Sequence, residues 1–249
     1  MNYKKVLGVG VTSMMLFSVI SPTFALAEGM EKKATNFCDG LSILEAKNAK
    51  KIENKENKID IKREEKTLKL KDNWATFDVK REMNRSKEEA NRTEKMAKKE
   101  NKLDTDAEKE KMMAFKTSIE NATQTRKEAV DSAVKAYRDG TEKIINDRKT
   151  MIDGITGAYK NAITEALAKA KADCASGIDS KTVASAFRTA QNGAKEKMKT
   201  DRMTAEKISE EVKNLVEVRK QAVEKARTDF KMTTEKAREA LKNSLNKTQ

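Results

Sequence analysis

Residues 175–182 read Ala-Ser-Gly-Ile-Asp-Ser-Lys-Thr, and this stretch predicts a reversal of the chain. Gly177 can adopt the left-handed conformation that commonly ends an α-helix. Asp179 or Ser180 can then cap the first turn of a following helix with a side-chain oxygen. We therefore expect two antiparallel helices that lie side by side on either side of this stretch.

The residues after the reversal have the clearest helical pattern in the chain. Small and apolar side chains recur three and four positions apart from Val183 to Leu245, and charged residues fill most of the remaining surface. This spacing, with one polar gap near Lys197 and Asp201, is typical of a stripe that packs against other helices. It predicts a basic helix over 180–247.

The residues before the reversal follow the same period. Apolar side chains again recur at three and four positions from Val130 to Cys174, which predicts a helix over 107–175. Gly140 lies inside this helix, where a glycine costs about 1 kcal/mol relative to alanine. We favour a continuous helix, with either close approach of a neighbouring helix or a hinge at Gly140. The alternative is a true break, with Thr141 capping a new helix.

The segment over 41–104 predicts a further, highly charged helix. Its apolar residues follow helical spacing, although Lys, Arg and Asn interrupt the stripe, and the runs that alternate as strands do are only three residues long. We expect its one close aromatic pair, Trp74 and Phe77, to be buried against a neighbouring helix. The motif from Thr105 to Glu108 reads as a capping box that starts the next helix. A turn should therefore separate the two helices, unless they merge.

Residues 1–27 predict a secretory signal peptide. Two lysines precede an apolar run of about 15 residues, and Ala25-Leu26-Ala27 provides the small side chains that a signal peptidase needs. The alternative is an uncleaved anchor, but spanning a bilayer takes about 20 apolar residues. We expect an exported mature chain with a lead-in over 28–40, located in the periplasm, at the cell surface or outside the cell. No later segment is apolar enough to predict a transmembrane span.

Cys38 and Cys174 are the only two cysteines. In an exported protein, an even number of cysteines favours a disulfide. If the chain turns near residue 106, Cys38 lies as many residues before the turn as Cys174 lies after it. Two antiparallel helices would then place both cysteines at the end opposite the turn. A bond would close a loop of about 135 residues and stabilise the fold by roughly 5 kcal/mol in the chain-entropy model. The alternatives are two unrelated thiols or a bond between chains.

These patterns together predict an all-α fold, a long antiparallel helical hairpin extended into a three-helix coiled-coil rod. Each helix would be roughly 95–100 Å long at 1.5 Å per residue. Residues 28–249 contain no proline, which favours a few long elements. The core would be thin and rich in alanine, so pairing with a second copy could add stability.

The composition excludes most catalytic chemistry. The chain contains 53 Lys or Arg, 40 Asp or Glu and no histidine, with a formal net charge of +13. Without histidine, no Ser-His-Asp or Cys-His arrangement can form, and the commonest metal ligand is missing. We expect the carboxylates to lie on solvated helix faces, where nothing shifts their pKa values. The sequence therefore predicts a non-enzymatic protein without catalytic residues, metal site or cofactor.

The positive charge is concentrated in the last segment, because residues 180–249 contain 17 basic and only 10 acidic residues. Seven basic residues recur every seven positions in two sets, which places each set along one flank of a helix. They form either the solvated edge of a coiled coil or a contact for something acidic, such as an envelope polymer, lipid headgroups or an acidic protein. These residues, here named the basic strip, are Lys181, Arg188, Lys195, Arg202, Lys213, Lys220 and Arg227.

We do not expect nucleic acid as the partner of this strip. Acidic residues are interspersed throughout the chain, and aromatic residues such as Tyr137 and Phe187 fall on the stripes that predict the core. No aromatic platform for base stacking is visible.

The primary functional hypothesis is an exported cell-envelope protein that works as a structural or protein-interaction rod. The alternative is a periplasmic holdase chaperone for unfolded proteins. The chain resembles the tentacled helical chaperones of that compartment in being basic, helical, exported and rich in Lys, Ala and Met. Eight methionines would suit an adaptable client surface, although we expect most of them to fill seams between helices: Met83, Met96, Met112, Met113, Met151, Met198, Met203 and Met232.

Overall fold

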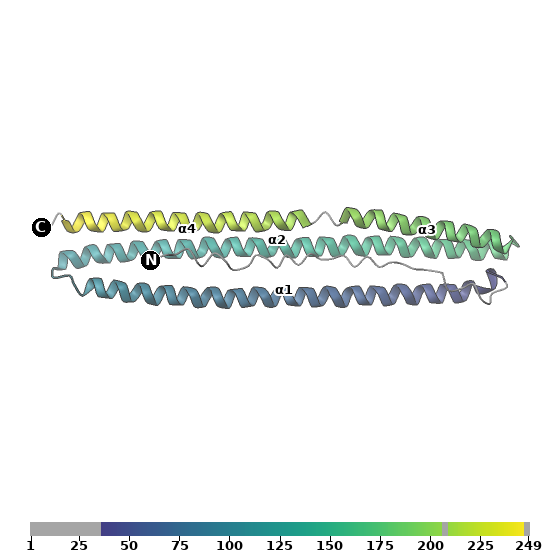
Figure 1. Cartoon of the computed structure of the whole chain (residues 1–249), viewed down its shortest axis with the longest axis horizontal. Coiled ribbons are helices and arrows are strands. Elements are labelled where there is room, and N and C mark those ends of the chain that lie inside the picture. The colour runs from purple at the N-terminus through teal and green to yellow at the C-terminus, as the bar shows by residue number, and fades with distance from the viewer. Residues whose placement is uncertain (1–35, 206–208, 247–249) are drawn as a thin grey trace, which may run out of the picture. The chain divides into compact units, whose positions relative to one another are not determined.

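The computed structural model describes residues 36–205 and 209–246. The predicted signal peptide over 1–27 lies outside the described residues, as does most of the lead-in. A short 3-10 helix, η1 (Cys38–Gly40), precedes four α-helices (Figure 1): α1 (Leu41–Glu100), α2 (Asp106–Ala175), α3 (Ser180–Ala205) and α4 (Ser209–Asn246). No strand occurs among the described residues, which confirms the all-α prediction. The short strand-like runs all lie inside α1.

Helices α3 and α4 occupy the segment for which a single helix over 180–247 is predicted. α3 ends at Ala205 and α4 begins at Ser209. Residues 206–208 lie outside the described residues, so the continuity of this helix stays a prediction. By contrast, α2 is unbroken through Gly140, which confirms the continuous helix favoured there over a break.

The chain divides into two compact units, which are described separately. Unit 1 combines the residues up to Asn48 with Ile144–Lys213, and unit 2 combines Ala49–Lys143 with the residues from Asn214 onward. Unit 1 therefore contains the start of α1, the second part of α2, all of α3 and the first residues of α4. Unit 2 contains the remaining parts of α1, α2 and α4.

The reversal between α2 and α3 in unit 1 follows the predicted chemistry. Gly177 has a φ of +77°, and its N–H donates to the Cys174 carbonyl at 3.1 Å, while the N–H of Ile178 donates to the Asp173 carbonyl at 3.1 Å. These two bonds form a Schellman motif, which satisfies the last carbonyls of α2. Of the two candidate caps, Asp179 starts α3, because its carboxylate accepts the backbone N–H groups of residues 181 and 182 at 3.1 and 3.0 Å.

The first described residues of unit 1 are attached to this reversal. Cys38 lies at disulfide distance from Cys174, with Cα atoms 5.8 Å apart, so the predicted proximity of the two cysteines is confirmed. Next to them, the N–H of Phe37 donates to Ser180 Oγ at 2.9 Å, and the Phe37 ring centroid lies 5.9 Å from that of Phe187. Ser180 therefore holds the residue before η1 rather than capping α3.

The core of unit 1 is a narrow apolar layer between helices. Val183 and Phe187 of α3 are buried one helical turn apart. The buried side chains of α2 are three and four positions apart, as its stripe predicts: Tyr159, Ile163, Leu167 and Ala170. Burying a large aliphatic side chain of this kind stabilises a fold by roughly 1.5–3 kcal/mol.

In unit 2, a turn that ends in a capping box joins α1 to α2. Thr105 Oγ1 accepts the N–H of Glu108 at 3.3 Å, and the Glu108 carboxylate accepts the N–H of Thr105 at 3.1 Å. This reciprocal pair satisfies backbone N–H groups that the start of a helix leaves without partners. The pKa of Glu108 is lowered because its carboxylate accepts hydrogen bonds from the Thr105 backbone N–H and from the Thr105 hydroxyl. α1 and α2 are thus separate helices, as the capping box predicts.

An apolar cluster lies beside this turn and forms the core of unit 2. Met112, Phe115 and Ile119 of α2 are buried in it, one helical turn apart. Partly buried residues of α1, the turn and α4 pack against the cluster: Met96, Leu103, Ala237 and Leu241. Parts of three helices therefore share one core.

Contacts further along unit 2 show that α2 and α4 are antiparallel. Lys111 Nζ near the start of α2 donates to the Ser244 carbonyl near the end of α4, at 2.8 Å. Twenty-nine residues later on α2, a Cβ added to Gly140 would lie 2.8 Å from Leu215 Cδ1. The side chain of Leu215 on α4 therefore occupies the space that a Cβ at residue 140 would need.

Candidate interaction surfaces

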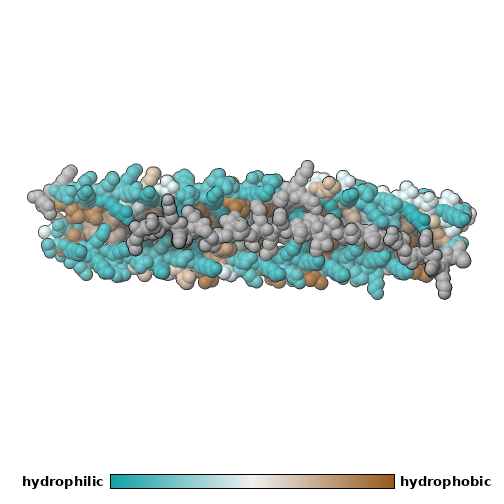
Figure 2. Space-filling view, viewed as in Figure 1, coloured by the Kyte–Doolittle hydropathy of each residue, from teal (hydrophilic) through white to brown (hydrophobic). Residues whose placement is uncertain are grey.

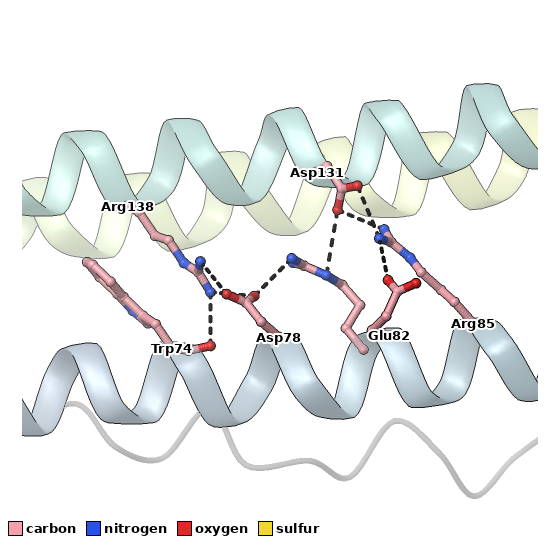
Figure 3. Close-up of polar contacts among 7 residues, drawn as sticks. Trp74, Asp78, Glu82, Arg85, Asp131 and Arg138 are labelled. Carbon is pink, nitrogen blue, oxygen red and sulfur yellow. Dashed lines mark hydrogen bonds and ion pairs between the residues drawn. The ribbon is translucent and has the colours of Figure 1, made fainter.

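Arginine side chains join α1 and α2 across unit 2 (Figure 3). The two terminal nitrogens of Arg138 each donate to Asp78 at 2.8 Å, and one of them also donates to the Trp74 carbonyl at 3.2 Å. The guanidinium lies 5.3 Å from the centre of the Trp74 ring. Because the forked hydrogen bonds and the ring act together, this guanidinium is held more firmly than in a single exposed ion pair.

Arg85 makes a second forked contact, from α1 to α2. It donates to both carboxylate oxygens of Asp131, at 2.8 and 3.1 Å. Arg81 lies between the two forks, 2.9 Å from Asp78 and 3.6 Å from Asp131. From the first fork to the second, the residue numbers rise along α1 and fall along α2, so these helices are antiparallel in unit 2.

The contacts between the two helices also set the ionisation of the network. The hydrogen bond from Arg138 holds the pKa of Asp78 below its ordinary value of 3.8, and the hydrogen bond to Asp131 raises the pKa of Arg85. The prediction that no carboxylate pKa is shifted is therefore wrong for Asp78, and also for Glu108 and Asp179, whose carboxylates accept hydrogen bonds at helix starts. The basic partner of Asp78 comes from another helix, which the periodicity of α1 does not reveal.

Two further arginines stack on aromatic rings between α2 and α4. Arg126 of α2 donates to Glu88 of α1 at 2.7 Å, and its guanidinium carbon lies 4.4 Å from the centre of the Phe230 ring of α4. Arg219 of α4 lies 4.3 Å from the centre of the Tyr137 ring of α2. Arg126 therefore contacts the other two helices of unit 2, and the arginine network serves to hold all three in register.

Sequence reasoning missed this network, although a signal for it exists. Arg81, Arg85 and Arg92 follow helical spacing along α1, and Arg92 donates to Thr123 Oγ1 of α2 at 2.7 Å. Arginine is preferred over lysine where an ion pair is partly buried or forked. A run of arginines at helical spacing, in a helix whose other basic residues are lysines apart from Arg63, could therefore have indicated the inner face of α1.

The basic strip does not have a uniform environment on α3. Lys181 and Arg188 are exposed, whereas Lys195 and Arg202 are half-buried. On α3, only the first two members of the strip are therefore exposed to solvent.

On α4, all three residues of the strip are exposed. Each is paired with a glutamate one helical turn earlier: Lys213 with Glu210 at 2.8 Å, Lys220 with Glu217 at 3.6 Å and Arg227 with Glu224 at 3.7 Å. Exposed ion pairs of this kind contribute about 0–1 kcal/mol, so an external acidic group could replace these glutamates at small cost. The role of the strip as a contact stays a prediction.

Exposed apolar side chains form a second class of surface. The Phe77 side chain is 50% exposed, so the prediction that both residues of the Trp74–Phe77 pair are buried is wrong for Phe77. In Figure 2, hydrophilic residues predominate on the face in view, and hydrophobic residues are visible between them.

The expectation that most of the eight methionines fill seams is also wrong. Met112 and Met198 are buried, but five others are exposed: Met83, Met113, Met151, Met203 and Met232.

Among the described residues, no group of three or more His, Cys, Asp or Glu side chains could hold a metal ion. Within 36–205 and 209–246, no helix has both the length and the apolar character needed to cross a membrane. Searches of protein-family models, of curated proteins and of solved structures found no match to this chain.

Proposed function

We propose that this protein is an exported, non-enzymatic component of the cell envelope that works as a structural or protein-interaction rod. In this proposal, its long helices form an antiparallel three-helix coiled coil. The basic strip on α3 and α4 contacts an acidic component of the envelope. The function then depends on length and surface charge rather than on a catalytic site.

The observation that best supports the proposed contact is the state of Lys181 and Arg188. Both are exposed and lie seven residues apart on α3. Lys181 interacts electrostatically with Asp179, two residues before it. The segment over 180–249 has seven more basic than acidic residues. A surface of this kind attracts anionic polymers and loses affinity as salt screens it.

The cysteine pair supports export. Cys38 and Cys174 lie at disulfide distance, and disulfides persist in oxidising compartments but are rare in the cytosol. The predicted signal peptide agrees with this placement, and no helix among the described residues suggests a membrane span.

Binding of the purified protein to cell envelopes isolated from its own source, measured at low and high salt, tests the proposal. We expect binding to weaken steeply with salt. The K181E/R188E variant should bind at least about tenfold more weakly, a loss of about 1.4 kcal/mol. The matched control is K116E/K127E, which changes the net charge equally at two exposed positions of α2.

Unchanged binding of the K181E/R188E variant would contradict the proposal. An equal loss in the control would show that only the net charge of the protein matters and that the strip has no special role.

The exposed methionines favour a second candidate function, the holdase chaperone. Methionine side chains are flexible and polarisable, so a surface that displays them can adapt to many apolar clients. Met83 and Met113 are among the most exposed. A holdase should suppress aggregation of a denatured client at a roughly stoichiometric ratio and should be little affected by salt. The M83Q/M113Q variant should then suppress aggregation less well, whereas a spacer rod should not suppress it at all.

A further inference from the structure

The face of α1 that points away from α2 carries an apolar strip in unit 2. At about 100° of rotation per residue, its members fall within a sector roughly 80° wide. Four large side chains of this sector are exposed: Ile61 at 58%, Leu68 at 56%, Val79 at 69% and Met83 at 63%. The exposed alanines at 75, 90 and 97 lie in the same sector. We name this set the outer strip.

The outer strip takes no part in the packing of unit 2. The residues of α1 that contact α2 include Trp74, Asp78, Arg81 and Arg85, and they lie on the opposite side of the helix. Glu88, Arg92 and Met96, which also contact α2, lie on that same inner side. α1 therefore carries apolar side chains on its outer side as well as on its inner side, where Ile59, Leu70 and Met96 are partly buried. This differs from the usual surface helix, whose outer face is polar.

Charged residues border the outer strip asymmetrically. One border is basic, with exposed Lys58, Lys62, Lys69, Lys80 and Lys87. The other border is largely acidic, with exposed Glu64, Glu82 and Glu89, and Lys71 is its one basic member over this stretch. An apolar stripe with lysines on one border and glutamates on the other is the pattern by which paired helices select a partner and an orientation.

This asymmetry distinguishes the two ways in which a second copy could pack on the strip. In a parallel pair, each border faces the opposite border of the partner, so lysines meet glutamates. In an antiparallel pair, each border faces its own kind, so lysines meet lysines. The charges therefore favour a parallel pair related by a twofold axis along α1.

We propose that a second copy of this chain binds the outer strip of α1 and that the two α1 helices are parallel and in register over residues 61–90. The pair has limited strength, because two acidic residues lie within the sector of the outer strip, Glu65 at the same angle as Met83 and Asp72 at the same angle as Ala90. Each is close in sequence to Lys69, four residues after Glu65 and three before Asp72, so local pairing can offset part of their charge. This self-association does not depend on the proposed acidic partner.

Sedimentation equilibrium of the purified protein over a range of concentrations tests the pairing. We expect a reversible dimer. The L68E/V79E variant, which keeps good helix formers at both positions, should have a dissociation constant at least about tenfold higher. The matched control is M113E/V218E, at exposed apolar positions of α2 and α4, and it should dimerise as the unchanged protein does. Helix content by circular dichroism verifies that each variant is folded.

A monomer at every concentration would overturn the proposal, and so would an equal effect of the control substitutions. Orientation is tested with two separate variants, L68C and A90C, oxidised and resolved on non-reducing gels. A parallel pair in register brings each position next to its own copy, so both variants should form crosslinked dimers. An antiparallel pair can do so at no more than one of them, and that result would overturn the parallel arrangement.

Discussion

Replacing Cys38 and Cys174 together by serine tests the covalent link beside the α2–α3 reversal of unit 1. The two residues are 136 positions apart in sequence, and their Cα atoms are 5.8 Å apart. In the chain-entropy model, closing a loop of that length removes about 17 cal/mol/K from the unfolded chain, which is about 5 kcal/mol at 25 °C. We expect the double variant to lose about this much free energy of unfolding.

Thermal unfolding followed by far-ultraviolet circular dichroism measures the loss. For a chain of this size, about 5 kcal/mol corresponds to a fall in Tm of about 10–20 °C. Reduction of the unchanged protein is the matched perturbation, because it breaks the same bond without altering the sequence. It should lower the Tm equally, and the double variant should not respond to reductant.

Non-reducing mass spectrometry of the purified protein first establishes the bond. Free thiols, or a bond between chains, would refute the pairing within one chain. An intact bond whose reduction lowers the Tm by less than about 3 °C would refute the entropy argument, because the unfolded chain would then already hold its ends close together.

Three further predictions concern the two units, and each is measured by urea unfolding. Asp78→Asn should lower the free energy of unfolding by about 1 kcal/mol at pH 7, a small value because the Asp78 side chain is 39% exposed. The folded-state pKa of Asp78 lies below its ordinary value of 3.8. The contribution of Asp78 is therefore present above about pH 4 and is lost as the pH falls through the folded-state pKa. Asp60→Asn, in a local pair on α1, should have little effect, and equal losses for the two variants would contradict the argument. Gly177→Ala should destabilise the fold by about 1 kcal/mol, because the φ of residue 177 is +77°. Gly193→Ala is the control inside α3, where nothing lies within 4 Å of an added Cβ. It should stabilise the fold by up to about 1 kcal/mol. Phe115→Ala should cost about 3–5 kcal/mol, since Phe115 is buried in the core of unit 2; a loss under about 1 kcal/mol would show that this cluster is not a packed core.

The sequence alone predicts the features of this fold that depend on neighbouring residues. The left-handed helix end at Gly177, a cap at Asp179 or Ser180 and the capping box at Thr105 each involve residues within a few positions of one another, and the backbone requirements at helix ends select these residue types. The period of small and apolar residues likewise predicts long helices. The proximity of Cys38 to Cys174 follows from the same information, because two antiparallel helices joined by one turn place residues equally far before and after the turn next to each other.

Only the tertiary structure decided which polar side chains meet across helices and which apolar ones remain exposed. Arg138 reaches Asp78 only in one register of α1 against α2, and a shift by a single residue would rotate either side chain away from the interface. The exposure of Phe77 and Met83 depends in the same way on which side of α1 its neighbours cover. Helical periodicity identifies the faces of a helix, but the packing of helices far apart in sequence determines which face is buried.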